Sequence, residues 1–456
     1  MTILIKIKKT KIKYSVFLIL LIINMHTGLY SQNKKSDTIQ IFTLPECINY
    51  ALDKQPNLNR SIINKAIVKK TNAINLSGWL PQIIFSGNAI HYIQLPTTFQ
   101  SGNGQSTPVH NGFVNTITPQ LSVSQTIFNP QLMYFANIAP LLSIQAAQRT
   151  DSVKISIIST VSKSFYNLLI ILEQVNILKE DTIRLRKSAD DTHHQYEGGL
   201  VDITDYDEAV ITLNNSKAQL MQQTENIRTA YANLKQVMGY PSENQFNVAK
   251  GDTSQMMQEI AFDTTQVLQY EKRIEYQQLQ TAKKLQESIT TYDKLAFLPT
   301  VSASYINIYE FEGNTSSTVF SNKFPYSYFG LSLNFPLFTG FSRIENLRRS
   351  KLQEKSLNWA EIDLKSELYT EYITALASYK SNVYNWEQLT DNKKLAKEVY
   401  EIVSLQYQQG TVAYINVIVA ESNLITAEID YINAFYQILS SKIDLEKALG
   451  AISTNQ

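Results

Sequence analysis

One uninterrupted helical pattern, from Ser342 to about Gln408, constrains this chain more than any other feature of its sequence. Neither glycine nor proline breaks these 67 residues, and the pattern ends just before Gly410. At about 1.5 Å per residue, a helix of this length extends roughly 100 Å. A globular core has no use for so long a helix, so the sequence predicts an extended helical assembly.

The chain repeats one plan twice, which indicates an internal two-fold repeat. Each copy contains a helix, a strand pair, a long helix, a turn and another helix. We assign the first structural repeat to 41–239 and the second to 263–452. A polar linker at 240–262 joins them, and a short tail at 453–456 follows.

Residues 195–239 and 406–450 align without a gap and share nine identical positions among 45. Both segments also carry large and small residues at alternating steps of three and four, which predicts a heptad seam between packed helices. From the heptads alone, an ordinary helical-bundle core fits as well. The seam positions are Leu213, Ser216, Leu220, Gln223, Ile227, Ala230, Leu234 and Val237 in the first copy, and Leu424, Ala427, Tyr431, Ala434, Ile438, Ser441, Leu445 and Ala448 in the second.

Turn and stop signals set the expected bounds of the elements. In the first copy they predict a helix over 43–77, strands over 82–95 and 116–128 with a loop at 97–115, a long helix over 131–195 and a helix that ends at Met238. In the second copy they predict a helix over 263–297, strands over 300–311 and 326–338 with a loop at 313–321, the long helix over 342–408 and a helix that ends at Leu449.

The predicted strands alternate apolar and polar residues, so each has one apolar and one wet face. Aromatic residues make up 11 of the 43 residues from 299 to 341, against 11% of the whole chain. Such enrichment is typical of the interfacial girdles of a membrane β-barrel, although a soluble sheet with one buried face would alternate in the same way. The apolar positions are Leu121, Val123 and Ile127 in one strand and Phe329, Leu331, Leu333 and Phe335 in another.

Four strands are too few to close a membrane barrel, for which eight is the usual minimum. Three chains would supply twelve, enough to enclose a lumen. Beyond residue 31 no segment approaches the 18 to 20 apolar residues of a transmembrane helix, so a closed barrel is the expected way into a membrane. We therefore predict a mostly α fold with a membrane β-barrel: a trimeric, twelve-stranded barrel with four strands per chain, continued by a long α-helical coiled-coil barrel.

The first 31 residues have the order of a cleavable secretory signal peptide. Five lysines within the first 13 residues precede an apolar run at 16–23 and the small residue Ser31, after which we expect cleavage. That run is too short to span a bilayer, and an uncleaved anchor is the alternative.

Removing five lysines and no acid changes the net charge from +1 to −4, which argues against nucleic acid as a partner. Cys47 is the only cysteine and is expected to be buried on a helix.

Four kinds of short motif occur in a specific order, and most occur twice. They are the opening Leu44-Pro45-Glu46-Cys47-Ile48 with Ala51-Leu52 and Pro56, the strand entries Leu80-Pro81-Gln82 and Leu298-Pro299-Thr300, the strand exit Phe335-Pro336-Leu337-Phe338-Thr339-Gly340 with its looser match at 125–130, and the helical tips at 196–205 and 407–412. Because these motifs occur in this order and most of them occur twice, the chain from about 41 to 452 resembles the TolC family of outer-membrane efflux proteins.

The resemblance implies a homotrimeric channel in the cell outer membrane that extends into the periplasm. Such a protein is the passive exit duct of a tripartite efflux or type I secretion system. The implied partners are a periplasmic adaptor (a membrane fusion protein), an inner-membrane transporter of the RND or ABC type that supplies the energy, and outer-membrane lipid. No cofactor, metal or catalytic site is expected, and the exported substrate, the adaptor and the pump stay open.

The resemblance also assigns roles at the periplasmic tip. In the family archetype a tyrosine and an arginine of the second copy hold the tip closed, the arginine pairs with an acid of the first copy, and two aspartates ring the pore. Tyr407 matches the tyrosine and Asp205 the acid, but Val412 replaces the arginine. Asn416 and Val419 replace the aspartates and still share a helix face. The positions expected to dock the adaptor are Gly199, Leu200, Val201, Gly410, Thr411 and Val412.

The lock must therefore differ from that of the archetype. Asp202 and Asp205, with Asp207 and Glu208, are the candidates for negative charge near the aperture. The alternative is a solvated helix start, where acids interact favourably with the helix dipole.

Two other functions were weighed. An enzyme lacks support, because His193 and His194 are adjacent and are expected to point apart on a helix, without the partner four residues away that a zinc helix needs. A periplasmic coiled-coil scaffold or adaptor-like protein without a channel would also contain long heptad helices. It would not need two aromatic-rich strand pairs with proline and glycine at corresponding places.

Overall fold

The computed structural model describes residues 40–102, 105–249 and 260–453. The predicted signal peptide lies outside these residues. Contacts divide the chain into two units, and the smaller includes 40–41 and 245–248 among the described residues. There β1 (Gln40–Phe42) pairs with β6 (Phe246–Val248), so the segment 240–262, expected to be a linker, contains a strand. All other described elements belong to the larger unit.

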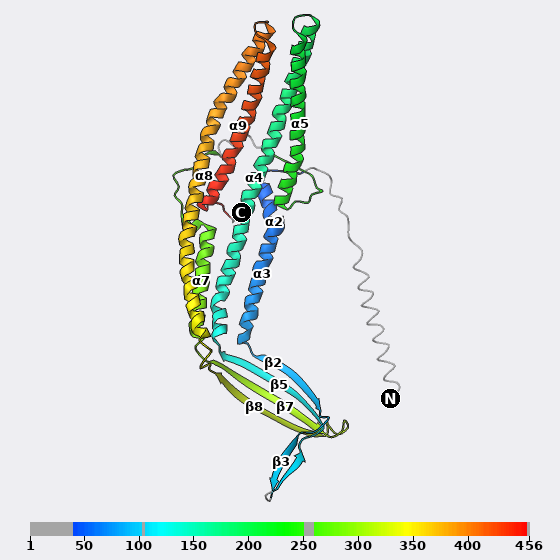
Figure 1. The fold of residues 1–456 in the computed structure, drawn as a ribbon, viewed down its shortest axis with the longest axis vertical. Coiled ribbons are helices and arrows are strands. Elements are labelled where there is room, and N and C mark those ends of the chain that lie inside the picture. Colours follow the sequence, from blue (N-terminus) through cyan, green and yellow to red (C-terminus); the bar gives the residue numbers. More distant parts are fainter. Residues whose placement is uncertain (1–39, 103–104, 250–259, 454–456) are drawn as a thin grey trace, which may run out of the picture. The chain divides into compact units, whose positions relative to one another are not determined.

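Four long helices dominate the larger unit. They are α4 (Pro130–Glu197), α5 (Ile203–Met238), α8 (Ser342–Gln408) and α9 (Tyr414–Leu449). A tight turn joins α4 to α5 and another joins α8 to α9, and each pair packs side by side along its length (Figure 1). The two pairs also meet, because α4 contacts α9. The uninterrupted sequence pattern from 342 to 408 coincides with α8.

The predicted seam forms the core of these helix pairs. Leu234 in α5, and Ile438 and Leu445 in α9, are fully buried. All sixteen seam positions are buried or half-buried, whereas most other residues of α5 are exposed. The repeat of three and four residues therefore located the packed face of both helices correctly.

Glycines end α5 and α9 at corresponding places. Gly239 and Gly450 adopt left-handed backbone with φ of 68° and 70°, the usual conformation of a residue that terminates a helix. Both are also closely packed: a Cβ on Gly239 would lie 2.8 Å from Cδ of Pro56, and one on Gly450 would lie 2.8 Å from the carbonyl oxygen of Lys272. Each glycine is thus required by its backbone and by its neighbours.

The helix predicted over 43–77 is two helices, α2 (Leu44–Lys54) and α3 (Pro56–Leu76), followed by the 3-10 turn η1 (Ser77–Trp79). Proline disfavours helical backbone in the residue before it, and Gln55 is extended. The Gln55 side chain instead caps α3 by accepting hydrogen bonds from the backbone N–H groups of Asn57 and Leu58, at 2.6 Å and 3.1 Å. The Leu44-Pro45 start was predicted correctly, and the break at Pro56 was missed.

The helix predicted over 263–297 begins eleven residues later, as α7 (Ile274–Leu295), after the 3-10 turn η2 (Tyr270–Lys272). Two tyrosines of α8 account for part of this difference. The Tyr372 hydroxyl donates to the carbonyl oxygen of Gln266 at 2.9 Å, and the Tyr379 hydroxyl donates to that of Ile260 at 2.6 Å. These carbonyls therefore accept hydrogen bonds from α8 and not from the next turn of a helix. Because the donors come from another part of the chain, the local pattern of apolar residues could not indicate this.

Four strands form an antiparallel sheet in the order β2-β5-β7-β8. They are β2 (Gln82–His91), β5 (Asn115–Phe128), β7 (Thr300–Gly313) and β8 (Asn322–Asn334). The two central strands come from different copies of the repeat, so the sheet joins the copies.

Three strand predictions need correction. The strand expected over 82–95 ends at His91, and the strand expected over 326–338 runs from Asn322 to Asn334. Pro336, which lacks a backbone N–H, follows that end closely. The predicted loop at 97–115 contains a hairpin of β3 (Thr97–Gly102) and β4 (Gln105–His110), whose polar strands carry no hydrophobic alternation that would have indicated it.

By length and composition, one helix in the described part of the chain, α4, could cross a membrane. The expectation that no segment after the leader has such a composition was therefore wrong. A core helix passes the same test, and α4 packs against α2, α3, α5, α7 and α9. The apolar character of α4 is accounted for by these contacts.

Candidate functional site

The α4–α5 and α8–α9 turns have the same backbone structure. Gly199 and Gly410 are left-handed, with φ of 73° and 69°. The N–H of Leu200 donates to the carbonyl of Gln195 at 2.8 Å, and the N–H of Thr411 donates to the carbonyl of Gln406 at 3.0 Å. This six-to-one bond is the Schellman closure of a helix C-terminus. The two tips are therefore matched features of the two copies.

The predicted docking positions all lie in these two turns. Leu200 is 79% exposed, and Gly199, Gly410 and Thr411 are also exposed, whereas Val201 and Val412 are half-buried. An exposed leucine at a helix end is available for a partner. The docking role itself stays a prediction.

Tyr407 joins the two copies just beside the tips. Its hydroxyl donates to Oε1 of Gln195 in α4 at 2.7 Å, and its ring lies 5.3 Å from that of Tyr414. Burial raises the pKa of Tyr407, with a smaller rise from the charge of Asp205. The hydroxyl thus bonds an amide, and Asp205, expected as the acid of the lock, acts on it only through its charge.

The other aperture candidates lie near the starts of α5 and α9. Asp202 is the exposed residue that precedes α5, and its side chain makes no capping bond. Asn416 and Val419 are both exposed on α9, three residues apart, and the Asn416 amide donates to the carbonyl of Ala413 at 3.3 Å. That Asn416, Val419, Asp202 or Asp205 lines a pore stays a prediction.

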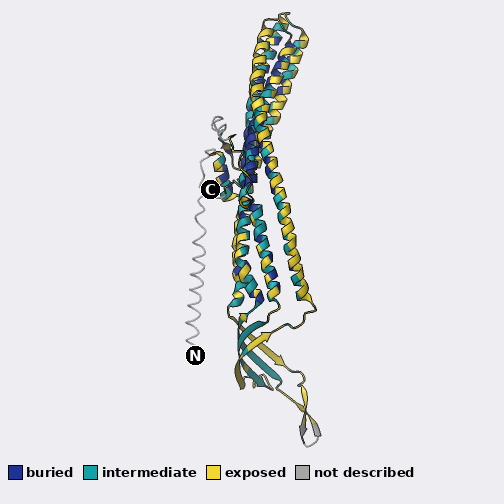
Figure 2. Ribbon diagram, turned by 90° about the vertical axis from the view of Figure 1, so that its left-hand side faces the viewer, coloured by how far each residue is buried: buried dark blue, intermediate teal, exposed yellow. Residues whose placement is uncertain are grey.

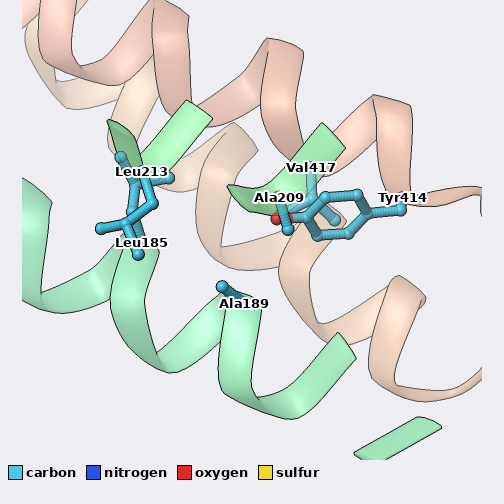
Figure 3. Packing of buried hydrophobic residues seen from close by; sticks show 6 residues of the cluster. All are labelled: Leu185, Ala189, Ala209, Leu213, Tyr414 and Val417. Carbon is cyan, nitrogen blue, oxygen red and sulfur yellow. The ribbon is translucent and has the colours of Figure 1, made fainter. Parts of the chain in front are cut away.

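An apolar cluster lies next to the tips and includes both copies (Figure 3). Tyr414 is almost fully buried within it, and its hydroxyl shares a hydrogen bond of 2.9 Å with the Ser188 hydroxyl. Burial raises the pKa of Tyr414 to about 12. The cluster consists of Leu185 and Ala189 of α4, Ala209 and Leu213 of α5, and Tyr414 and Val417 of α9.

Sequence reasoning missed most of this cluster, although a signal was available. The seam of α9 continues toward the helix start by the same steps of four and three, from Leu424 to Glu421, Val417 and Tyr414. All four residues are buried. The continuation places an ionisable residue, Glu421, at a core position.

His193 and His194 do not point apart as expected. His193 Nε2 lies 3.5 Å and His194 Nδ1 lies 3.6 Å from the carboxylate of Glu197, which is the residue four positions after His193. The His193 ring also stacks 4.8 Å from that of Tyr206. Within the described ranges, no group of three or more histidine, cysteine, aspartate or glutamate side chains could hold a metal ion. Cys47 is buried on α2, as predicted.

The register of the sheet gives it one largely apolar face and one face that carries most of its serines. Directly paired residues of antiparallel strands point to the same side. Phe329 pairs with Tyr305, which pairs with Val123, which pairs with Ile83, so all four share one face. The neighbouring row on the opposite face holds Gly330, Ser304, Ser124 and Gln82.

The apolar face is exposed. The exposed fractions are 86% for Phe329, 74% for Leu331, 69% for Ile83 and 73% for Phe85. Figure 2 shows buried residues along the helices, whereas the sheet carries intermediate and exposed residues. Within the described part of this single chain, no other element covers that face, although a water-soluble sheet usually buries its apolar side.

Paired long helices and an exposed, two-faced antiparallel sheet define a membrane protein with a helical extension. The chain belongs to the outer membrane efflux protein family, whose model matches residues 48–240 and 277–451. A comparison with curated proteins found no match.

Solved outer-membrane proteins share this fold. The outer membrane protein VceC of Vibrio cholerae is 16% identical, with a TM-score of 0.71 over 89% of this chain and 96% of that one. The CmeC outer membrane channel of Campylobacter jejuni is 17% identical, with a TM-score of 0.70 over 91% and 87%. The MtrE outer membrane channel of Neisseria gonorrhoeae is 18% identical, with a TM-score of 0.68 over 89% and 88%.

Proposed function

We propose that this protein is the outer-membrane exit duct of a tripartite efflux or type I secretion system and acts as a homotrimer. The observation that carries the proposal is the exposed apolar face of a four-stranded sheet with two open edges, β2 and β8. In a lipid bilayer the backbone groups of an open edge have no water to bind, so each edge needs a partner strand. Pairing β8 of one chain with β2 of the next, three times, closes a barrel of twelve strands.

The two faces of the sheet support the same arrangement. In a closed barrel, Phe329, Leu331 and Ile83 would contact lipid. The serine-rich face, with Ser304 and Ser124, would line a water-filled lumen. This division requires no movement of the strands from their present register.

The helices also carry apolar residues suited to neighbouring copies. Helices α8 and α3 bury other residues of their own but leave large apolar side chains exposed. These are Trp359 and Ile362 of α8, and Ile63 and Ile74 of α3. We infer that the helix pairs of adjacent chains cover these residues and extend the barrel as a twelve-helix tunnel. Segments 41–239 and 263–452 would then be the two repeats of each chain, and the two segments matched by the family model support this division.

The duct has no enzymatic role in this proposal. Its energy comes from an inner-membrane transporter of the RND or ABC type, to which a periplasmic adaptor connects it at the 199–201 and 410–412 turns. Export to the outer membrane would use residues 1–31 as a cleavable signal peptide. The exposed turns of both copies support the docking site.

The mass of the purified particle in mild detergent tests the proposal. We expect three chains per particle, extraction with the outer-membrane fraction, and faster migration in SDS gels before heating than after it. A monomer that stays in the aqueous fraction would contradict the duct and favour the periplasmic scaffold.

A further inference from the structure

Three charged side chains are packed between the two copies, on the halves of α4 and α9 that lead to the tips. Asp181 and Arg184 lie one turn apart on α4, and Glu421 lies on α9. The side chains of Asp181 and Glu421 are only 1% and 3% exposed, and that of Arg184 is 27% exposed. We call these residues the charge triad.

The contacts of the triad are incomplete. Arg184 Nε donates to Glu421 Oε1 at 3.4 Å, a long hydrogen bond. Asp181 Oδ2 accepts a short one, of 2.6 Å, from the Ser216 hydroxyl of α5. Arg184 Nη2 and Asp181 Oδ1 are 3.6 Å apart, and both atoms are buried without a hydrogen-bond partner. Buried polar atoms are seldom left in this state.

The triad touches all four long helices. Tyr400 of α8 lies under the Arg184 guanidinium, 6.0 Å from it, and Ser216 links the triad to α5. Among the described residues, the titratable groups that face Glu421 are Asp181, Arg184, Tyr400 and Tyr414. One cation therefore faces two carboxyl groups.

This composition leaves one excess negative charge when both carboxyl groups are ionised. A buried charge without a partner is costly, and the cost can be removed by binding a proton or by admitting water. Burial and then the charge of Asp181 raise the pKa of Glu421 to about 7, against the opposing effect of Arg184. Burial also raises the pKa of Asp181.

The sign of the pH effect follows from these directions. A carboxyl group whose folded-state pKa is raised stabilises the packed state most when it is protonated, below its ordinary pKa. This contribution is lost as the pH rises from about 4.5 through about 7. The contact between α4 and α9 is therefore weakest above pH 7.

We propose that the charge triad is a proton-controlled lock that holds the second helix pair against the first on the half of the helices that leads to the tips. With one proton on the triad, the charges balance and α9 stays packed on α4. Loss of that proton leaves an uncompensated carboxylate between the helices, and the tips move apart. The inference rests on the proposed function, because separation of the helix pairs is the movement that would open a duct.

Distances between spin labels on the two tips test the lock directly. Leu200 and Thr411 are exposed, so both accept cysteine and a label, whereas Cys47 is buried and its pKa is raised to about 12, which keeps it unreactive. Labelled chains are diluted with unlabelled chains, so that each distance comes from a single chain. Measurements are made well below and well above the pKa of Glu421.

We expect the distance between the tips to lengthen as the pH rises, with a midpoint near pH 7. Glu421→Gln and Asp181→Asn each remove the excess charge while preserving side-chain shape. Both variants should therefore keep the short distance at both pH values. Glu401→Gln, the same change at an exposed position of α8, is the matched control and should behave as the parent protein.

A distance independent of pH in the parent chain would overturn the lock, as would an unchanged pH response in both triad variants. Because the triad variants lie on different helices, either one decides the question if the other fails to fold.

Conductance in planar bilayers separates the two proposals. A pH-dependent distance without any conductance would contradict the duct and keep the lock. Conductance unaffected by pH or by Glu421→Gln would contradict the lock and keep the duct.

Discussion

At the scale of single residues, the contacts beside the tips differ from those that the resemblance implies. Val412 stands where the resemblance places an arginine, and the Tyr407 hydroxyl bonds Gln195. A tyrosine–amide bond carries no formal charge, so salt should affect it little. Charged contacts between the copies lie further along α4, at Arg184 with Glu421 and at Lys163 with Asp444.

The Tyr407 bond can be tested by removing one atom. Tyr407→Phe deletes the hydroxyl and leaves the Gln195 amide to water, at a cost of about 0.5–1.5 kcal/mol. We expect the distribution of tip-to-tip label distances to broaden toward longer values. Tyr384→Phe, at an exposed tyrosine of α8, should leave the distribution unchanged. Identical distributions for both variants would show that the bond does not hold the tips.

At the scale of elements, helix ends were predicted more reliably than helix starts. Gly239 and Gly450 were read correctly as stop signals, since left-handed backbone after a helix is a local preference for glycine. The break at Pro56 was also a local signal, and it was overlooked. The late start of α7 could not be predicted, because the tyrosines of α8 that bind its preceding carbonyls come from a distant part of the chain.

The end of α5 gives a stability prediction. Gly239→Ala forces an L side chain into left-handed backbone and into a space already filled by Pro56. We expect a loss of more than about 1 kcal/mol, visible as a lower midpoint of thermal unfolding. Gly87→Ala in β2, where no atom lies within 4 Å of the new Cβ, is the control and should change the midpoint little. Equal midpoints of thermal unfolding for the two variants would mean that the turn at Gly239 relaxes around the added methyl group.

At the scale of the whole molecule, the sheet and the helices require different surroundings. The helix pairs bury their own seam, whereas the apolar face of the sheet stays exposed in a single chain. The proposed trimer and lipid would cover that face. In this proposal a single chain is incomplete, so assembly and membrane insertion belong to one prediction.

A pair of lysine substitutions on adjacent residues of β8 tests this prediction. Leu331 lies on the apolar face and Ser332 on the polar face. Leu331→Lys should cost up to about 2–4 kcal/mol if the site faces the middle of the bilayer, and the heat-modifiable form should be lost from the outer-membrane fraction. Ser332→Lys should retain that form. If both variants insert equally, the apolar face does not contact lipid.

The sequence by itself determined the long helices, their packed seam, the two-faced strands and the doubling of the plan, because each depends on the spacing of apolar residues and on local backbone preferences. The tertiary structure alone decided that strands of the two copies meet at the centre of the sheet, that the chain before α7 is bound by α8, and that Glu421 is buried opposite Arg184 and Asp181. These features depend on contacts between residues far apart in the chain, and no local pattern encodes such partners.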